Sequence, residues 1–284
     1  HSDLSPSSAY HHRAFPTGAA DWASPYPIPL GTGKISKKTM PILHTEAITL
    51  RRRRGREADA LVTLFTRRAG KIIASTRGVL KTTSRYAGVT QPFNHLNVIL
   101  YAKVQEQEIW TLTQVSLVES FDAVQGDLKR IAWASCLAEW IEAFSGDFES
   151  NLAVWDLLLD TLRGWNRREP AEEELIQCQW RLLVSAGLQP NLHHCHRCGG
   201  RESSAWYYLP ADGCLACAAC VHQGLRLGHG AIQALRRMTG PAPAPLIRLT
   251  PQQKNEIRRL LLTHVEYHTG VRLRSPLFLE QLDF

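Results

Sequence analysis

Five of the seven cysteines lie within 26 residues, in the stretch CHRCGGRESSAWYYLPADGCLACAAC. Cys195 and Cys198 form one Cys-x-x-Cys pair, and Cys217 and Cys220 form another after 18 intervening residues. Each pair can turn two sulfurs toward one tetrahedral ion, and this separation is typical of a four-cysteine zinc ribbon. We therefore expect one structural Zn²⁺ per chain, held by these four thiolates.

The fifth cysteine leaves an alternative open. Cys214 also forms a Cys-x-x-Cys pair with Cys217, and it follows Cys198 after 15 intervening residues. One thiol among Cys214, Cys217 and Cys220 is therefore spare, and the spacing does not identify it. Nearby histidines offer substitute ligands, although a histidine beside four cysteines is more often a bystander: His193, His194, His196 and His222.

The pattern favours a structural ion over a catalytic one. A catalytic zinc keeps one coordination position open, and a zinc deaminase carries Pro-Cys-x-x-Cys. Here His194 precedes Cys195, and Ala216 precedes Cys217. We expect this element to fold and not to react, so that the protein is not an enzyme. The competing hypotheses are a zinc-dependent nucleic-acid hydrolase or deaminase, and a zinc-ribbon adaptor that binds other proteins.

The whole chain sets the limits for these hypotheses. Its 284 residues are 44% hydrophobic and 21% charged, which is enough for two globular domains. No apolar run approaches the length of about 18 residues that a membrane span needs. The N-terminus also has no basic region leading into an apolar one, so we expect a cytoplasmic protein that makes no membrane contact. Thiols are reduced in the cytosol, and there this spacing indicates metal ligands and not disulfides.

Residues 1–39 are rich in Pro, Gly, Ser and Thr and show no helical or strand period, so we expect a disordered tail or leader before Met40. The GTGKIS stretch within them resembles a phosphate loop. However, Ile28 stands where that motif needs its first glycine, and Ile35 stands where it needs Ser or Thr. No nucleotide cofactor is expected.

The net charge of +7 is unevenly distributed along the chain. Residues 40–120 contain 12 basic and 6 acidic side chains, which gives +6. Residues 121–190 contain 6 basic and 12 acidic side chains, which gives −6, and residues 191–284 return to +5. Basic regions on either side of an acidic middle indicate a polyanion as partner for the basic regions.

Between Ile42 and Phe121, short β-branched and aromatic runs are separated by turn residues, a pattern that predicts a small β-barrel over 40–121. We expect its basic residues to lie largely in the connections, with aromatic residues interleaved. That composition is typical of an oligonucleotide-binding barrel. We expect Tyr101 and Trp110 to be core residues. The candidate DNA-binding residues are Arg51, Arg52, Arg53, Arg54, Arg56, Arg67, Arg68, Lys71, Arg77, Lys81, Arg85 and Tyr86.

After Gly126 the hydrophobic period becomes helical, with Asp127 as a candidate cap. Pro170 is expected at the first position of a later helix, and a final helix is expected from Thr250-Pro251 to Gly270. The sequence therefore predicts a multidomain α+β protein. An OB-fold barrel is followed over 122–284 by a helical domain, into which a zinc ribbon at 193–222 is inserted.

Three further motifs carry a resemblance to a known family. They are GREADALVTLFTRRAGKI from Gly55, Gly78-Val79, and QPF at Gln91 to Phe93, followed by helices that the paired cysteines interrupt. From Met40 to Phe284 the chain resembles the RecO recombination mediators. This resemblance implies an OB barrel, a helical domain with a zinc ribbon, and a nucleoid-associated protein. It also implies binding to single- and double-stranded DNA, annealing of complementary strands, and work with RecR to load RecA onto strands coated by single-strand-binding protein.

The resemblance assigns the metal ligands to Cys195, Cys198, Cys217 and Cys220. The family usually has a double glycine three residues before its third ligand. Here Asp212-Gly213 and one extra residue precede Cys217, so Cys214 stays open as an alternative.

The resemblance further implies contact with the acidic, apolar tail of single-strand-binding protein. We expect that tail to bind an apolar groove edged by cations, and we place this groove at Trp165, Arg167 and Arg168. An equally good interpretation is that the two arginines only complement a helix C-terminus.

Overall fold

The computed structural model describes residues 42–55, 59–76, 86–103, 107–239, 245–275 and 279, all within the unit Met40–Phe284. The expected tail and the GTGKIS stretch lie outside these residues. No helix in the described part of the chain has the length and apolar character that spanning a membrane requires.

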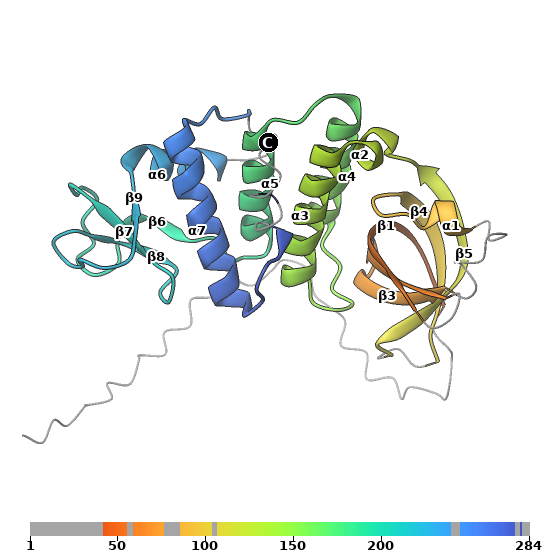
Figure 1. Ribbon diagram of the computed structural model, residues 1–284. Coiled ribbons are helices and arrows are strands. Elements are labelled where there is room, and N and C mark those ends of the chain that lie inside the picture. The colour runs from red at the N-terminus through yellow and green to blue at the C-terminus, as the bar shows by residue number, and fades with distance from the viewer. Residues whose placement is uncertain are drawn as a thin grey trace, which may run out of the picture. The chain divides into compact units, whose positions relative to one another are not determined.

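The N-terminal strands close into a five-stranded barrel in the order β1-β2-β3-β5-β4 (Figure 1). Neighbouring strands are antiparallel except for β3 and β5, which run parallel. This topology is an OB-like barrel, as predicted. Its elements are β1 (Ile42–Arg54), β2 (Ala60–Thr66), β3 (Gly70–Thr76), the short helix α1 (Tyr86–Val89), β4 (His95–Tyr101) and β5 (Ile109–Glu119).

Alternation along the strands fills the barrel. In β3, buried residues alternate with half-buried ones, so that one face points inward. Trp110 is buried as expected, whereas Tyr101 is half-buried. The inward-facing side chains form a core of their own: Ala47, Val62, Leu64, Ile72, Ala74, Leu96, Val98, Leu100, Ala102 and Trp110.

The helices follow the barrel, with a second sheet inserted among them (Figure 1). Asp127 caps α3, since its side chain accepts a hydrogen bond from the Arg130 N–H at 2.8 Å. The final helix begins after the capping residue Thr250 and ends at Gly270, as predicted. The helices are α2 (Asp122–Gly126), α3 (Leu128–Phe144), α4 (Leu152–Arg167), α5 (Glu172–Ser185), α6 (His229–Met238) and α7 (Pro251–Thr269).

The expected start of α5 was wrong by two residues. The helix begins at Glu172, with Ala171 as its cap, and not at Pro170. The carboxylate of Glu174 accepts a hydrogen bond from the Ala171 N–H at 3.3 Å. This carboxylate satisfies the N–H of the capping residue, so the helix begins after Ala171.

The inserted sheet has the order β6-β8-β7-β9. Its strands are β6 (Asn191–Cys195), β7 (Trp206–Leu209), β8 (Cys214–Cys217) and β9 (Leu225–Leu227). Arg236 of α6 holds this sheet to the helices, because its guanidinium donates to the Leu192 carbonyl. Trp206 and Tyr208 are buried in the same core as the helices.

Outward-facing residues of the barrel also enter the helical core. Phe65 of β2 stacks on Trp155 of α4 with ring centroids 6.5 Å apart, and His95 meets the same indole edge-on at 5.6 Å. Gly70 has a φ of 61°, and a Cβ there would lie 1.9 Å from the Glu149 carbonyl oxygen. The β2–β3 turn therefore packs directly against the loop between α3 and α4.

Candidate metal centre and nucleic-acid interface

The structure brings Cys195, Cys198, Cys217 and Cys220 together at one place. Their sulfur atoms all lie within 4.8 Å of one another, and the Cys198 and Cys217 sulfurs are 3.7 Å apart. Four sulfurs around one zinc ion, each at about 2.3 Å, would be separated by about 3.8 Å. The group therefore has the size of a tetrahedral zinc site.

Backbone hydrogen bonds hold both knuckles. The Gly199 N–H donates to the Cys195 carbonyl at 2.8 Å, and the Cys220 N–H donates to the Cys217 carbonyl at 3.0 Å. Gly199 has a φ of 72°, a conformation that favours glycine and allows the first turn. The sequence thus folds each Cys-x-x-Cys pair so that two sulfurs point to the same side.

The thiol of Cys195 has a lowered pKa. Burial acts to raise the pKa of the Cys195 thiol, but backbone N–H groups of Cys198, Cys217 and Arg197 outweigh burial and lower it to about 6. Hydrogen bonds to the neighbouring sulfurs raise the pKa of Cys220 to about 12. In the absence of a cation the group therefore shares protons among its sulfurs, and a bound metal ion would displace them.

Cys214 lies outside the four-sulfur group, and strand geometry explains why. Cys214 and Cys217 are the two ends of β8, and successive side chains of a strand point to opposite faces. A separation of three residues within a strand therefore places the two sulfurs on different faces. A Cys-x-x-Cys pair aims both sulfurs at one ion only when it crosses a turn, as Cys217 and Cys220 do.

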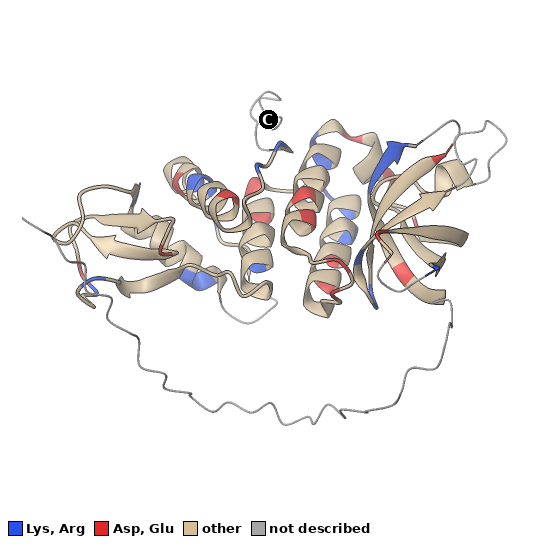
Figure 2. Cartoon of the chain, turned by 90° about the horizontal axis from the view of Figure 1, so that it is seen from below, with Lys and Arg blue, Asp and Glu red and all other residues tan. Residues whose placement is uncertain are grey.

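Some of the cations that were predicted to bind DNA form ion pairs within the protein. Arg51 to Arg54 lie in β1, whereas they were expected in a connection between strands. Arg51 forms an ion pair with Glu142 of α3 at 3.2 Å, and Lys71 forms one with Asp147 at 3.3 Å. Figure 2 shows such basic segments of the barrel beside helices that carry acidic residues. Arg51 and Lys71 therefore hold the barrel to the helices.

Other predicted DNA-binding residues have different surroundings. Arg52 donates to the Ala87 carbonyl at 2.6 Å, whereas Arg53 and Arg54 are exposed. Tyr86 is half-buried and lines a small hollow with residues of β5. Arg56, Arg77, Lys81 and Arg85 lie outside the described residues.

Arg67 and Arg68 flank an open groove of about 870 Å³ on the outer face of the barrel. Strand register builds its floor from two rows of outward-facing side chains. His44, Ile99 and Gln114 form one row across β1, β4 and β5. Glu46, Asn97 and Ser116 form the other. The sequence analysis missed these residues, although polar side chains at alternate strand positions are a readable sign of an outer face.

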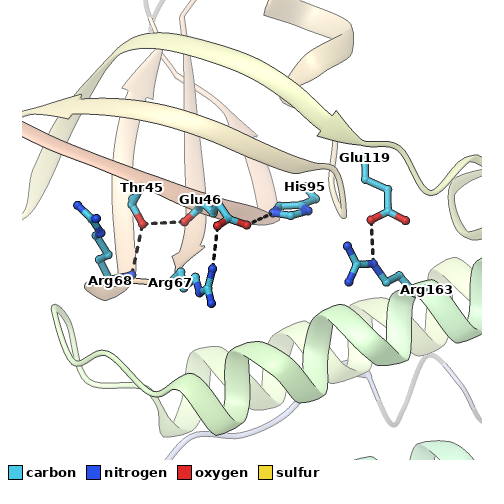
Figure 3. A network of polar contacts seen from close by, with 7 residues as sticks. All are labelled: Thr45, Glu46, Arg67, Arg68, His95, Glu119 and Arg163. Atoms are coloured by element: carbon cyan, nitrogen blue, oxygen red, sulfur yellow. Dashed lines mark hydrogen bonds and ion pairs between the residues drawn. The ribbon is translucent and has the colours of Figure 1, made fainter.

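A polar network fixes one wall of this groove (Figure 3). Arg67 Nη1 and His95 Nε2 each lie 2.9 Å from a carboxylate oxygen of Glu46. Burial acts against ionisation of Glu46, but the hydrogen bonds from Arg67 and His95 outweigh it and lower the pKa of its carboxyl. Arg68 lies beside this network, and its backbone N–H donates to Thr45 Oγ1 at 3.3 Å. The Arg68 guanidinium donates to the His44 carbonyl, also at 3.3 Å, and it forms no ion pair with another described residue.

The predicted partner site at Trp165 was wrong in its central residue. Trp165 is 1% exposed, and its Nε1–H donates to Glu174 at 3.2 Å. Arg168 forms an ion pair with the same carboxylate. Arg167 is exposed but has no accessible aromatic floor at Trp165. The sequence shows where tryptophans recur along a helix but not which ring faces the core. In the folded protein, Trp165 faces the core.

A different cavity has the composition that was expected for the partner site. It measures about 810 Å³ and lies among α3, α5 and α7. Trp133, Trp140 and Leu262 contribute apolar surface to it. Trp140 is 1% exposed, and its Nε1–H finds no acceptor among the described residues. The cations around this cavity are Lys129, Arg248, Lys254, Arg258 and Arg259. Lys129, Lys254 and Arg258 already form ion pairs with Glu169, Glu172 and Glu173, so Arg248 and Arg259 are the cations offered to a partner.

Comparison with known protein families decides the relationship of this chain. The model for "Recombination protein O N terminal" matches residues 40–121, and the model for "Recombination protein O C terminal" matches residues 125–277. The chain belongs to the RecO family. It is therefore a RecO-family protein with a role in DNA repair.

Individual RecO proteins are similar over most of their length. The DNA repair protein RecO of Symbiobacterium thermophilum is 31% identical over 252 residues, which cover 86% of this chain and 98% of the relative. That of Heliobacterium modesticaldum is 34% identical over 248 residues, covering 83% and 88%. That of Anaeromyxobacter sp. strain K is 33% identical over 235 residues, covering 80% and 91%.

Proposed function

We propose that this RecO-family protein is a DNA-binding recombination mediator without turnover chemistry. It binds single- and double-stranded DNA, anneals complementary strands and, together with RecR, helps load RecA onto strands coated by single-strand-binding protein in the cytoplasm. Residues 40–121 act as the DNA-binding domain, and residues 122–284 act as the domain for protein partners. The observation that carries the proposal is the barrel groove with Arg67 and Arg68 at its wall and polar side chains on its floor.

The chemistry of the groove suits a nucleic-acid backbone. Arginines hold phosphates by charge, and amide and hydroxyl groups such as those of Asn97, Gln114 and Ser116 hydrogen-bond to phosphate or sugar oxygens. Contacts to phosphate and sugar carry no base-sequence information directly. We therefore expect binding with little sequence preference.

The four-cysteine group supports a structural Zn²⁺, one per chain. Four thiolates fill a tetrahedral coordination sphere, so no position is left for an activated water at that ion. The His-x-Glu triplets of this chain begin at His44 in β1 and His264 in α7. Neither contributes a ligand to the four-sulfur group. This arrangement favours a mediator over a zinc-dependent hydrolase or deaminase.

The α3–α5–α7 cavity is the best candidate for the tail of single-strand-binding protein. An acidic, apolar peptide would place its apolar side chains against Trp133 and Leu262 and its carboxylates among the surrounding cations. The unpaired Nε1–H of Trp140 offers one more donor. Replacing Arg248 and Arg259 with Ala should weaken binding of a tail peptide by about tenfold. Replacing the exposed Arg237 and Arg272, which do not line the cavity, should leave the affinity unchanged.

Annealing tests the proposed function as a whole. Two complementary oligonucleotides, each coated with single-strand-binding protein, would be mixed with the full-length chain, and duplex formation followed by fluorescence. We expect the wild type to accelerate annealing and the Arg67→Ala, Arg68→Ala variant to do so much less. An absence of acceleration by the wild type, both with and without RecR, would reject the mediator assignment.

A further inference from the structure

A second group of metal-binding side chains lies next to the four-cysteine group. It consists of His196, Asp212 and Cys214, and one donor atom from each lies within 4.8 Å of the other two. Cys214 is the thiol that the four-sulfur group leaves out, and His196 is one of the histidines that the cysteine spacing left without a role. The three residues are therefore the surplus donors of the ribbon, gathered at one point.

Backbone pairing fixes all three donors. His196 N–H donates to the Leu215 carbonyl at 2.8 Å, and Asn191 N–H donates to the Gly213 carbonyl at 2.9 Å. Gly213 has a φ of 60° and closes the turn that carries Asp212 into β8. The positions of the side chains thus follow from the sheet itself, and no loop rearrangement is needed to assemble them.

The group is distinct from the four-sulfur site. Its thiol occupies the opposite face of β8 from Cys217, because the two residues are three apart within the strand. None of its three members belongs to the other group. Cys214 is 3% exposed, whereas His196 and Asp212 are exposed. The thiol of this group is therefore buried, and its imidazole and carboxylate face solvent.

The donor set specifies the kind of ion. A thiolate and an imidazole select borderline or soft transition ions such as Zn²⁺ and Co²⁺ over Mg²⁺ and Ca²⁺, which prefer oxygen ligands. With the thiolate and the carboxylate both ionised, the two negative charges balance one divalent cation. Arg197 competes for Asp212, but their 3.9 Å separation lies between exposed groups, and such ion pairs are weak.

We propose that His196, Asp212 and Cys214 form a second metal site, which binds one divalent transition ion through one nitrogen, one oxygen and one sulfur. Three protein ligands leave a fourth tetrahedral position for solvent or an exogenous donor. This site therefore binds its ion more weakly than the four-sulfur site, and it exchanges that ion while the other is retained.

Cobalt titration of the full-length, zinc-loaded chain tests the proposal. Thiolate coordination to Co²⁺ gives a charge-transfer absorption band, and total metal is counted after removal of free ions. We expect a second ion per chain and a new thiolate band. Cys214→Ser should abolish the band, and His196→Ala or Asp212→Asn should weaken binding of the second ion by about tenfold or more. The matched control is His222→Ala, an exposed histidine of the ribbon outside the group.

The outcomes separate this site from the proposed structural zinc. A Cys198→Ser, Cys220→Ser variant should lose both ions, because the second site lies on strands that the first ion stabilises, whereas Cys214→Ser should lose the second ion alone. Saturation at one ion that Cys214→Ser leaves unchanged would overturn the second site alone. A second ion that survives Cys214→Ser, His196→Ala and Asp212→Asn would overturn it as well. Asp212→Asn changes one exposed side chain, so it serves if Cys214→Ser fails to fold.

Discussion

The buried His264 shows how one side chain joins the ribbon to the helices. Its Nε2 donates to the Leu188 carbonyl at 2.6 Å, and its Nδ1 accepts from the Tyr208 hydroxyl. This pair of contacts requires the neutral imidazole. Burial, reinforced by His268, lowers the pKa of His264 to about 4, although the hydrogen bond to Leu188 opposes the shift.

This lowered pKa predicts acid sensitivity at one residue. The unfolded chain protonates its imidazole near pH 6.5, while the folded chain resists protonation down to about pH 4. The stabilisation is therefore complete above pH 6.5 and is lost as the pH falls toward 4, by about 3 kcal/mol. His264→Gln cannot titrate. The difference in unfolding free energy between wild type and His264→Gln, measured by urea denaturation, should shrink across this window.

Loss of the ribbon metal in acid affects both proteins equally, so the difference isolates the imidazole. A constant difference between the two proteins from about pH 7 to about pH 4 would contradict the role of His264.

For single residues, the sequence predicted well which cysteines can meet at one ion, and it predicted the burial and contacts of side chains poorly. The Cys-x-x-Cys spacing limited the metal ligands to five cysteines, and the family resemblance selected Cys195, Cys198, Cys217 and Cys220 among them. The exclusion of Cys214 depended on β8 extending through it, which the spacing does not encode. Trp165 was wrongly placed at the surface because the sequence around a tryptophan does not show whether its ring is buried or exposed.

At the level of single elements, the turn between β2 and β3 packs closely against the loop between α3 and α4. Gly70→Ala should destabilise the fold by about 3 kcal/mol or more, because the new Cβ would meet the Glu149 carbonyl at 1.9 Å in a left-handed backbone. Gly88→Ala is the control, since no heavy atom lies within 4 Å of its added Cβ. Urea unfolding should separate the two variants, and equal midpoints would show that the turn relaxes freely.

The ribbon is the element whose stability depends most on a bound ion. Its strands are three to five residues long, too short to be stable without further support. In a Cys198→Ser, Cys220→Ser variant, amides of residues 191–227 should exchange with solvent about 100-fold faster. Amides of β2 and β3 should keep their protection. Hydrogen-exchange mass spectrometry would measure both, and an unchanged ribbon would contradict a structural metal.

Elements were predictable where their signals are local. The final helix was predicted at both ends, since Thr250 caps its start and Gly270, with a φ of 67°, ends it. The assignment of Arg51 to Arg54 to a connection was wrong, because arginine runs are common in loops. Pairing with Ala60 to Thr63 of β2 keeps these arginines in β1. Arg51 also forms an ion pair with Glu142 of α3, which is distant in the sequence and leaves no local sign.

At the scale of the whole molecule, the charge pattern has two uses. The +6 of residues 40–120 indicated a polyanion partner, but Arg51 and Lys71 of that region pair with the acidic helices. Part of the charge contrast therefore holds the barrel and helices together. What is left for DNA among the described cations lies chiefly on the groove and the end of β1: Arg53, Arg54 and Arg68, together with Arg67, which also pairs with Glu46.

DNA binding in the barrel groove is tested by the affinity of the full-length chain for a single-stranded oligonucleotide, measured against salt concentration. Each phosphate contact contributes a log–log slope of about −0.7 on single strands, because binding releases condensed counterions. Arg67→Ala combined with Arg68→Ala should make the slope shallower by about 1.4, while Arg237→Ala combined with Arg272→Ala removes the same charge outside the barrel and should leave it unchanged. A flat dependence for the wild type, or equal slopes for the two double variants, would contradict DNA binding in the barrel groove.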